Sequence, residues 1–273
     1  MLLLLIKMSM KKNYNQPIGV FDSGLGGLTV LKYLIEYFPH ENFIYLGDLA
    51  NLPYGNKSEK NIISYSNKCA QFLQSKNVKS IIIACNTASS YAYDVIRKSS
   101  KIPIFDVISP CVEEIIASKS KKVAILGTEK TIESNIYANS IKKRNQNIKV
   151  YNKACPLFVP IVEEGFEGTS IADSIIDYYL KDIKQIKIDQ LILGCTHYPI
   201  LIKDLKKYFE DSVSILHSGP IIAKILSSNF KNISQKNNSQ SISYYVTDLP
   251  NRFKKYGSKF LSKKIDSPKL VSI

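Results

Sequence analysis

Two cysteines in this chain each follow directly on a short run of apolar residues. Residues 81–90 have the sequence IIIACNTASS, and residues 191–199, 110 positions later, have the sequence LILGCTHYP. A continuous apolar run is typical of a buried parallel strand, and open α/β sheets bind their ligands just beyond the carboxyl ends of such strands. Each segment therefore places one thiol, Cys85 or Cys195, at a strand end. We predict that the two thiols face one another across a single small substrate.

Apolar runs and amphipathic stretches alternate along most of the chain, which predicts parallel sheets with right-handed crossovers. Because the cysteine-bearing segment occurs twice, we predict an α/β fold of two similar three-layer lobes with mainly parallel sheets. The lobes are expected to be related by a pseudo-two-fold axis, with the active site in the cleft between them. The first lobe would comprise residues 17–112 plus 225–273 and the second residues 113–224, and residues 1–16 would form a frayed N-terminal extension.

The sequence also predicts the local structure of two further segments. The polar stretch 231–241, KNISQKNNSQS, predicts a flexible loop. Residues 132–143 are predicted to form one helix after the polar turn that begins at Gly127 and Thr128.

The first strand, at residues 17–22, leads into the glycine-rich turn SGLGG at residues 23–27 and then into a helix. Glycines let a ligand approach the backbone closely, and a helix N-terminus offers unpaired N–H groups to an anion. The turn does not match a nucleotide-binding motif, and Asp22 would repel a pyrophosphate. A ligand that carries a carboxylate fits better, with Asp22 near an ammonium group or acting on a thiol. The turn Pro53-Tyr54-Gly55, after another predicted strand, suits a structural turn and a binding loop equally well.

The composition is that of a soluble globular protein, with 45% hydrophobic and 22% charged residues in 273, a length that favours two domains. The formal net charge of +14 raises the possibility of nucleic-acid binding. Only three of the 37 basic residues are arginine, however, and phosphate recognition favours arginine over lysine. We therefore predict a solvated lysine surface without a dedicated nucleic-acid site. A protein that binds DNA or a nucleic-acid enzyme stays as the alternative from a different functional class.

The five cysteines are an odd number without a CxxC pair, which favours free thiols in a reducing compartment. Cys69, Cys111 and Cys155 are expected to be packing residues. The N-terminal apolar run, LLLLI and its neighbouring methionine, is too short to span a bilayer and lacks the features of a secretory signal. We expect a cytoplasmic protein without membrane association, whose translation starts at Met1, Met8 or Met10.

Two facing thiols suit a proton transfer on both faces of one carbon atom. Inverting a carbon centre requires one base to remove a proton from one face while a conjugate acid delivers a proton to the other. A thiol has an ordinary pKa of about 8.5, so a modest shift makes it a thiolate at neutral pH. Asp22 is the candidate to exchange a proton with Cys85, and Glu163 or His197 with Cys195. Zinc bound by the two thiols and His197 is conceivable, but nothing in the spacing requires a metal.

Six segments, taken together, resemble the glutamate racemases of the aspartate/glutamate racemase superfamily. They are IGVFDSGLGGLTVL, GDLANLPYG, ACNTASS, GTEKTIESNIY, FVPIVEEG and LGCTHYPIL. The match as a whole runs from about residue 17 to residue 220. The resemblance implies two α/β lobes and the interconversion of L- and D-glutamate without a cofactor or a metal, supplying D-glutamate for peptidoglycan synthesis. A homodimer is expected, and glutamate is the expected small-molecule ligand. An aspartate racemase is the nearest alternative.

The resemblance also implies roles for individual residues. Cys85 would act on the D enantiomer and Cys195 on the L enantiomer, with Asp22, Glu163 and His197 as the other catalytic groups. Glu164 is the alternative to Glu163. The residues expected to line the substrate pocket are Asp22, Ser23, Pro53, Tyr54, Gly55, Asn86, Thr87, Thr128, Thr131, Thr196 and His197.

Overall fold

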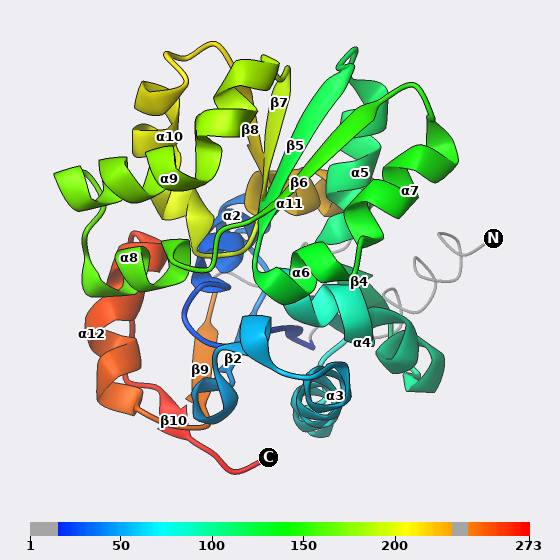
Figure 1. The fold of residues 1–273 in the computed structure, drawn as a ribbon. Coiled ribbons are helices and arrows are strands. Elements are labelled where there is room, and N and C mark those ends of the chain that lie inside the picture. Colours follow the sequence, from blue (N-terminus) through cyan, green and yellow to red (C-terminus); the bar gives the residue numbers. More distant parts are fainter. Residues whose placement is uncertain (1–15, 231–239) are drawn as a thin grey trace.

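The computed structural model describes residues 16–230 and 240–273. Nearly all of the predicted N-terminal extension, residues 1–16, and of the predicted loop 231–241 lies outside the described residues. Within them, strands and helices alternate, and the strands form two parallel sheets covered by helices (Figure 1). The predicted α/β class with mainly parallel sheets is confirmed.

The larger sheet has six strands in the order β10-β9-β2-β1-β3-β4. Every neighbouring pair in this sheet is parallel. The strands are β1 (Ile18–Asp22), β2 (Phe43–Gly47), β3 (Ser80–Ile83), β4 (Ile104–Asp106), β9 (Ile242–Val246) and β10 (Lys269–Leu270).

The smaller sheet has four parallel strands in the order β6-β5-β7-β8. They are β5 (Lys122–Gly127), β6 (Lys149–Ala154), β7 (Gln190–Gly194) and β8 (Ser214–His217). In each sheet the first four strands along the chain therefore follow the same order, second, first, third, fourth. Cys85 follows the third strand of one sheet and Cys195 the third strand of the other. The pseudo-two-fold relation between the lobes stays a prediction, with which this shared order agrees.

Helices cover the faces of both sheets (Figure 1). The helix α2 packs against α11 and α12, α3 packs against α4, and α5 packs against α7 and α11. The α-helices are α2 (Leu28–Tyr37), α3 (Glu59–Ser75), α4 (Asn86–Ser99), α5 (Ile108–Ala117), α6 (Glu129–Glu133), α7 (Ile136–Arg144), α8 (Phe158–Glu164), α9 (Ser170–Ile186), α10 (Ile202–Tyr208), α11 (Ser218–Phe230) and α12 (Pro250–Leu261). Short 3-10 helices are η1 (Leu49–Asn51), η2 (Tyr54–Asn56) and η3 (Tyr198–Leu201).

The prediction of a single helix over residues 132–143 was wrong. The structure has two helices there, α6 and α7, separated at Asn135, whose φ of 52° is left-handed. Asparagine tolerates this conformation better than most residues. The hydroxyl of Ser134 accepts a hydrogen bond from the N–H of Ile136, at 3.3 Å, which offers the backbone an alternative to a continuous helix.

Buried strand residues on opposite faces of the larger sheet belong to different hydrophobic clusters. Val20 and Ile82 lie in one cluster, and Phe21 and Ile83 lie in another. The first of these clusters also contains residues of the smaller sheet, including Leu126 from β5. The two sheets thus share part of one core, and the predicted domain boundaries stay a prediction.

Candidate active site

A cavity opens where the carboxyl ends of strands from both sheets meet. It encloses about 430 Å³ not filled by atoms, part of which is open to solvent. Both Cys85 and Cys195 line it. The other lining residues are Ser23, Gly24, Leu52, Pro53, Tyr54, Gly55, Asn86, Thr87, Thr128, Val159, Glu163, Thr196 and His197.

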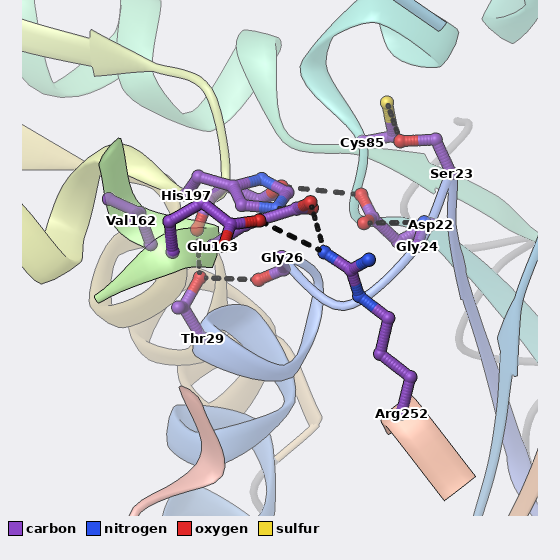
Figure 2. A network of polar contacts seen from close by, with 12 residues as sticks. Asp22, Ser23, Gly24, Gly26, Thr29, Cys85, Val162, Glu163, His197 and Arg252 are labelled. Atoms are coloured by element: carbon purple, nitrogen blue, oxygen red, sulfur yellow. Dashed lines mark hydrogen bonds and ion pairs between the residues drawn. The ribbon is translucent and has the colours of Figure 1, made fainter. Parts of the chain in front are cut away.

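Cys85 is held at the N-terminus of α4. Its sulfur accepts a 3.4 Å hydrogen bond from the backbone N–H of Ala88, and its thiol lies 3.7 Å from the hydroxyl of Ser23 (Figure 2). Burial and the neighbouring Asp22 carboxylate raise the pKa of Cys85 to about 12, although both hydrogen bonds act in the opposite direction. In the substrate-free protein this environment keeps the proton on the Cys85 sulfur.

The second thiol, Cys195, is followed by His197, which is hydrogen-bonded to Glu163. The His197 Nε2 atom lies 3.0 Å from Oε1 of Glu163, and both side chains are mostly buried (Figure 2). Burial lowers the pKa of His197, but hydrogen bonding with Cys195 and Glu163 outweighs it and raises that pKa to about 10. The same contact with His197, together with Arg252, keeps the pKa of Glu163 below its ordinary value despite partial burial. A cationic imidazole and a carboxylate therefore lie next to this cysteine.

Asp22, at the end of β1, is fully buried behind the cavity. One carboxylate oxygen accepts a 3.1 Å hydrogen bond from the N–H of Gly24, and the other accepts a 3.4 Å bond from the hydroxyl of Thr196 (Figure 2). Burial raises the pKa of Asp22, opposed by the charge of His197 and by the backbone hydrogen bonds. Asp22 thus connects the end of β1 in one sheet to the residue after Cys195 in the other.

The glycine-rich turn approaches the second cysteine segment too closely for any side chain at Gly26. A Cβ atom there would lie 2.2 Å from Oγ1 of Thr196 and 2.5 Å from Nδ1 of His197. The hydroxyl of Thr29 lies 2.8 Å from the carbonyl oxygens of both Gly26 and Thr196 and can donate to either. The turn therefore supports the backbone that carries His197.

Three threonine hydroxyls join the two sheets at another side of the cavity. Thr87, Thr128 and Thr131 are hydrogen-bonded to one another at 2.9 to 3.1 Å. Thr128 also caps α6, because its hydroxyl accepts from the N–H of Thr131 at 3.2 Å. Beside this cluster, Asn86 accepts a 2.7 Å hydrogen bond from the hydroxyl of Tyr137.

The loop after β2 closes the cavity with Pro53, Tyr54 and Gly55. The Tyr54 side chain is buried and donates a 2.6 Å hydrogen bond to Asp48. The hydroxyl of Thr247 donates to the same carboxylate at 2.8 Å. This buried network fixes the loop, and Gly55 packs so closely on Thr128 that a Cβ there would lie 2.7 Å from the Thr128 Cβ.

Comparison with known proteins identifies the family. The family model described as Asp/Glu/Hydantoin racemase matches residues 27–226. The chain belongs to this family. It is 41% identical to the glutamate racemase of Aquifex aeolicus over 256 residues, which cover 93% of this chain and 97% of that one. It is 44% identical to the glutamate racemase of Sulfurihydrogenibium sp. over 241 residues, with 88% and 91% covered.

A solved structure gives the same relationship. The crystal structure of the Francisella tularensis glutamate racemase in complex with D-glutamate superposes with a TM-score of 0.89 at 39% identity, covering 95% of this chain and 98% of that one. As a member of the racemase family, this chain is an amino-acid racemase and thus an isomerase.

Most residues that the sequence predicted for the racemase site line one cavity. Two do not: Asp22 lies behind it, and Thr131 reaches it through Thr87. Of the two adjacent carboxylates, Glu163 faces the cavity and Glu164 is exposed. The predicted packing residues Cys69, Cys111 and Cys155 are fully buried, and all five cysteines are free.

The sequence analysis did not single out Leu52 and Val159, which line the cavity, or Tyr137 and Arg252, which contact residues that line it. Arg252 lies 3.3 Å from the second oxygen of Glu163. A compositional signal could have indicated it, because Arg252 is one of three arginines among 37 basic residues. Tyr137 ends the segment GTEKTIESNIY, but nothing in the sequence around it assigns a role to its hydroxyl.

In residues 16–230 and 240–273, no group of three or more His, Cys, Asp or Glu side chains is arranged to hold a metal ion. The same part of the chain contains no helix with the length and apolar character needed to cross a membrane. The chemistry available in the cavity is that of thiols, an imidazole, carboxylates and hydroxyls.

Proposed function

We propose that this chain interconverts L- and D-glutamate by moving protons between the substrate Cα and the thiols of Cys85 and Cys195. The observation that carries the proposal is the position of these two cysteines. Each follows the third strand along the chain in its sheet, the first four strands of the two sheets share one order, and both cysteines line one cavity. The names of the relatives, glutamate racemases at about two fifths identity over most of the chain, support glutamate as the substrate.

In the proposed reaction, a thiolate on one face removes the Cα proton, and the thiol on the other face donates its proton to the resulting carbanion. The sulfur that accepted a proton ends as a thiol and the donor ends as a thiolate. The protonation states of the two cysteines are therefore exchanged after each turnover. Cys195 is assigned to the L enantiomer and Cys85 to the D enantiomer. A protonated Cys85, which its buried and acidic surroundings favour, is the state needed to complete the L-to-D direction.

The helper groups differ on the two sides. His197 is placed to exchange a proton with Cys195, and Glu163 is proposed to act through its hydrogen bond to His197. Asp22 is proposed to act on Cys85 chiefly through its charge, because its carboxylate is fully buried and held by Gly24 and Thr196.

The polar groups around the cavity are proposed to bind the charged ends of glutamate. Hydroxyls and backbone N–H groups suit the two substrate carboxylates. The residues assigned to the substrate pocket are Ser23, Pro53, Tyr54, Gly55, Asn86, Thr87, Thr128, Thr131, Thr196 and His197. Pro53 has neither a hydroxyl nor an N–H group and would contribute only the shape of its loop. Asp22, buried behind the cavity, is proposed to favour the substrate ammonium by charge. No step in this scheme calls for a cofactor.

Incubation in deuterated water tests the proposal directly. The purified protein is given L-glutamate or D-glutamate without any cofactor, and Cα deuterium and enantiomer composition are followed by NMR and chiral chromatography. Racemisation with deuterium in the product is expected from both enantiomers. Absence of both Cα exchange and the opposite enantiomer would refute the proposal, and turnover of aspartate instead of glutamate would favour the aspartate alternative.

We further propose that the enzyme is a cytoplasmic homodimer that supplies D-glutamate for peptidoglycan synthesis. Free cysteines agree with a reducing compartment. Growth of a bacterial strain that requires added D-glutamate, restored by this gene but not by its Cys85→Ala form, would support the cellular role. Light scattering of the purified protein tests the dimer.

A further inference from the structure

The Glu163 carboxylate is held between two partners from different parts of the fold. Its Oε1 atom lies 3.0 Å from Nε2 of His197, and its Oε2 atom lies 3.3 Å from a guanidinium nitrogen of Arg252. Figure 2 shows Arg252 extending from its helix toward the carboxylate, with the imidazole on the opposite side. Both oxygens are therefore engaged, and the carboxylate plane is fixed relative to the imidazole.

Arg252 belongs to α12, which is anchored to the larger sheet. Phe253, the next residue, packs on the rings of Tyr45 and Tyr244 at centroid distances of 5.8 and 6.0 Å. Tyr45 and Tyr244 lie in β2 and β9, and α12 also packs against α2. Glu163, in contrast, is carried by α8, which follows β6 of the smaller sheet. The ion pair thus connects a helix supported by one sheet to a catalytic-site helix of the other.

The same helix contacts the site at two further points. Lys259 donates a 3.2 Å hydrogen bond to the carbonyl oxygen of Val162 and pairs with Glu167 at 2.5 Å, which holds the end of α8. Phe260 packs edge-on against the His197 ring at a centroid distance of 5.4 Å. In Figure 1, α8 and α12 lie next to each other. The helix α12 therefore contacts both members of the Glu163–His197 pair.

We infer that Arg252 is a positioning residue of the racemase, which fixes the Glu163 carboxylate against His197 and so orients the imidazole next to Cys195. This inference rests on the proposed function. Arginine suits the task because its planar guanidinium directs its donors in fixed directions, whereas the lysine ammonium is a point charge on a flexible chain. Exposed ion pairs contribute little to stability, and Arg252 is 41% exposed, so its removal should affect the reaction more than the fold.

Steady-state kinetics of Arg252→Gln, in both directions and with α-deuterated substrates, tests the inference. The variant Arg252→Lys tests rescue by a shorter cation. Lys255→Gln removes one positive charge from the same helix without a contact to Glu163, and it serves as the matched control. Melting temperatures verify that each variant is folded.

We expect Arg252→Gln to lower kcat by about tenfold or more with a smaller change in KM, since small misplacements of reacting groups are costly. Because only the Cys195 side is disturbed, the deuterium isotope effect should rise from L-glutamate and fall from D-glutamate. Arg252→Lys should recover part of kcat, and Lys255→Gln should match the wild type.

Three results would overturn the inference while leaving the proposed function intact. The first is a wild type that racemises glutamate while the kcat of Arg252→Gln stays within about twofold of the wild-type value. The second is a loss of kcat in Lys255→Gln equal to that in Arg252→Gln. The third is a pair of deuterium isotope effects, from L-glutamate and from D-glutamate, that both rise or both fall. A wild type without racemisation would instead refute the proposed function itself.

Discussion

The hydroxyl of Tyr137 donates a 2.7 Å hydrogen bond to Oδ1 of Asn86. Tyr137 belongs to α7, which lies between β5 and β6 of the smaller sheet. Asn86 is the first residue of α4, which follows β3 of the larger sheet. Because the amide oxygen is occupied, the Nδ2 group is the end left available, and it is buried without a hydrogen-bond partner among the described residues. A buried free donor at a cavity lined by Asn86 is suited to bind a substrate carboxylate.

Tyr137→Phe should therefore weaken substrate binding more than it slows the reaction. Without the hydroxyl, the Asn86 amide is no longer held in the orientation that presents Nδ2. One hydrogen bond contributes about 1 kcal/mol, so KM for glutamate should rise about fivefold with a smaller change in kcat. Initial-rate measurements provide both constants, and Tyr178→Phe, at an exposed tyrosine, is the control. An unchanged KM in a folded Tyr137→Phe protein would contradict this role.

Removing either site thiol should abolish racemisation. Cys85→Ala and Cys195→Ala are each expected to lower kcat by at least about 100-fold, the usual contribution of a general acid or base. Residual Cα exchange in deuterated water should be confined to D-glutamate in Cys195→Ala and to L-glutamate in Cys85→Ala. Cys155→Ala, at a buried thiol outside the cavity, should remain active. A kcat above about one hundredth of the wild-type value in either site variant would exclude the two-thiol mechanism.

Gly26→Ala should inactivate the enzyme by displacing the second cysteine segment. The added Cβ would lie 2.2 Å from Oγ1 of Thr196 and 2.5 Å from Nδ1 of His197, so both side chains must move. We expect kcat/KM to fall about 100-fold. Gly19→Ala is the control, because the nearest neighbours of its Cβ would be Leu73 and Val78 at 3.2 Å, which do not line the cavity. It should lower the free energy of unfolding without a comparable loss of activity, and equal activity losses would argue against the steric explanation.

Protein stability should decrease as the pH rises above neutral. The pKa of His197 is raised from 6.5 to about 10 in the folded protein, so its stabilising contribution is fully present below pH 6.5 and is lost as the pH rises toward 10. The pKa of Cys85 is raised from 9.0 to about 12, so this thiol contributes in the same direction only above pH 9. The free energy of unfolding, measured with urea, should therefore decrease between pH 6.5 and pH 9, and the decrease should be smaller in His197→Gln. A variant that declines as steeply as the wild type would assign the effect to other groups.

The sequence by itself was sufficient to predict the strands, the turns and the reactive groups that depend on local residue patterns. Apolar runs followed by Cys85 and Cys195 predicted two strand ends with thiols, because side-chain burial along a short strand is a local property. The glycine turn after β1 and the threonines after β5 and β7 also follow directly on strands. Such residues meet at one cavity once the strands are parallel, since parallel strands end at the same edge of a sheet.

The tertiary structure decided which groups complete the site. Whether Glu163 or Glu164 meets His197 depends on how α8 is rotated against η3, and the contact between Glu163 and Arg252 joins residues 89 positions apart. The full burial of Asp22 depends on its enclosure by the glycine turn and Thr196. These relationships arise from the packing of distant elements, where a rotation of one helix exchanges one side chain for the next. Local propensities specify strands, turns and helix ends, but they do not fix how separate elements are rotated and spaced against one another.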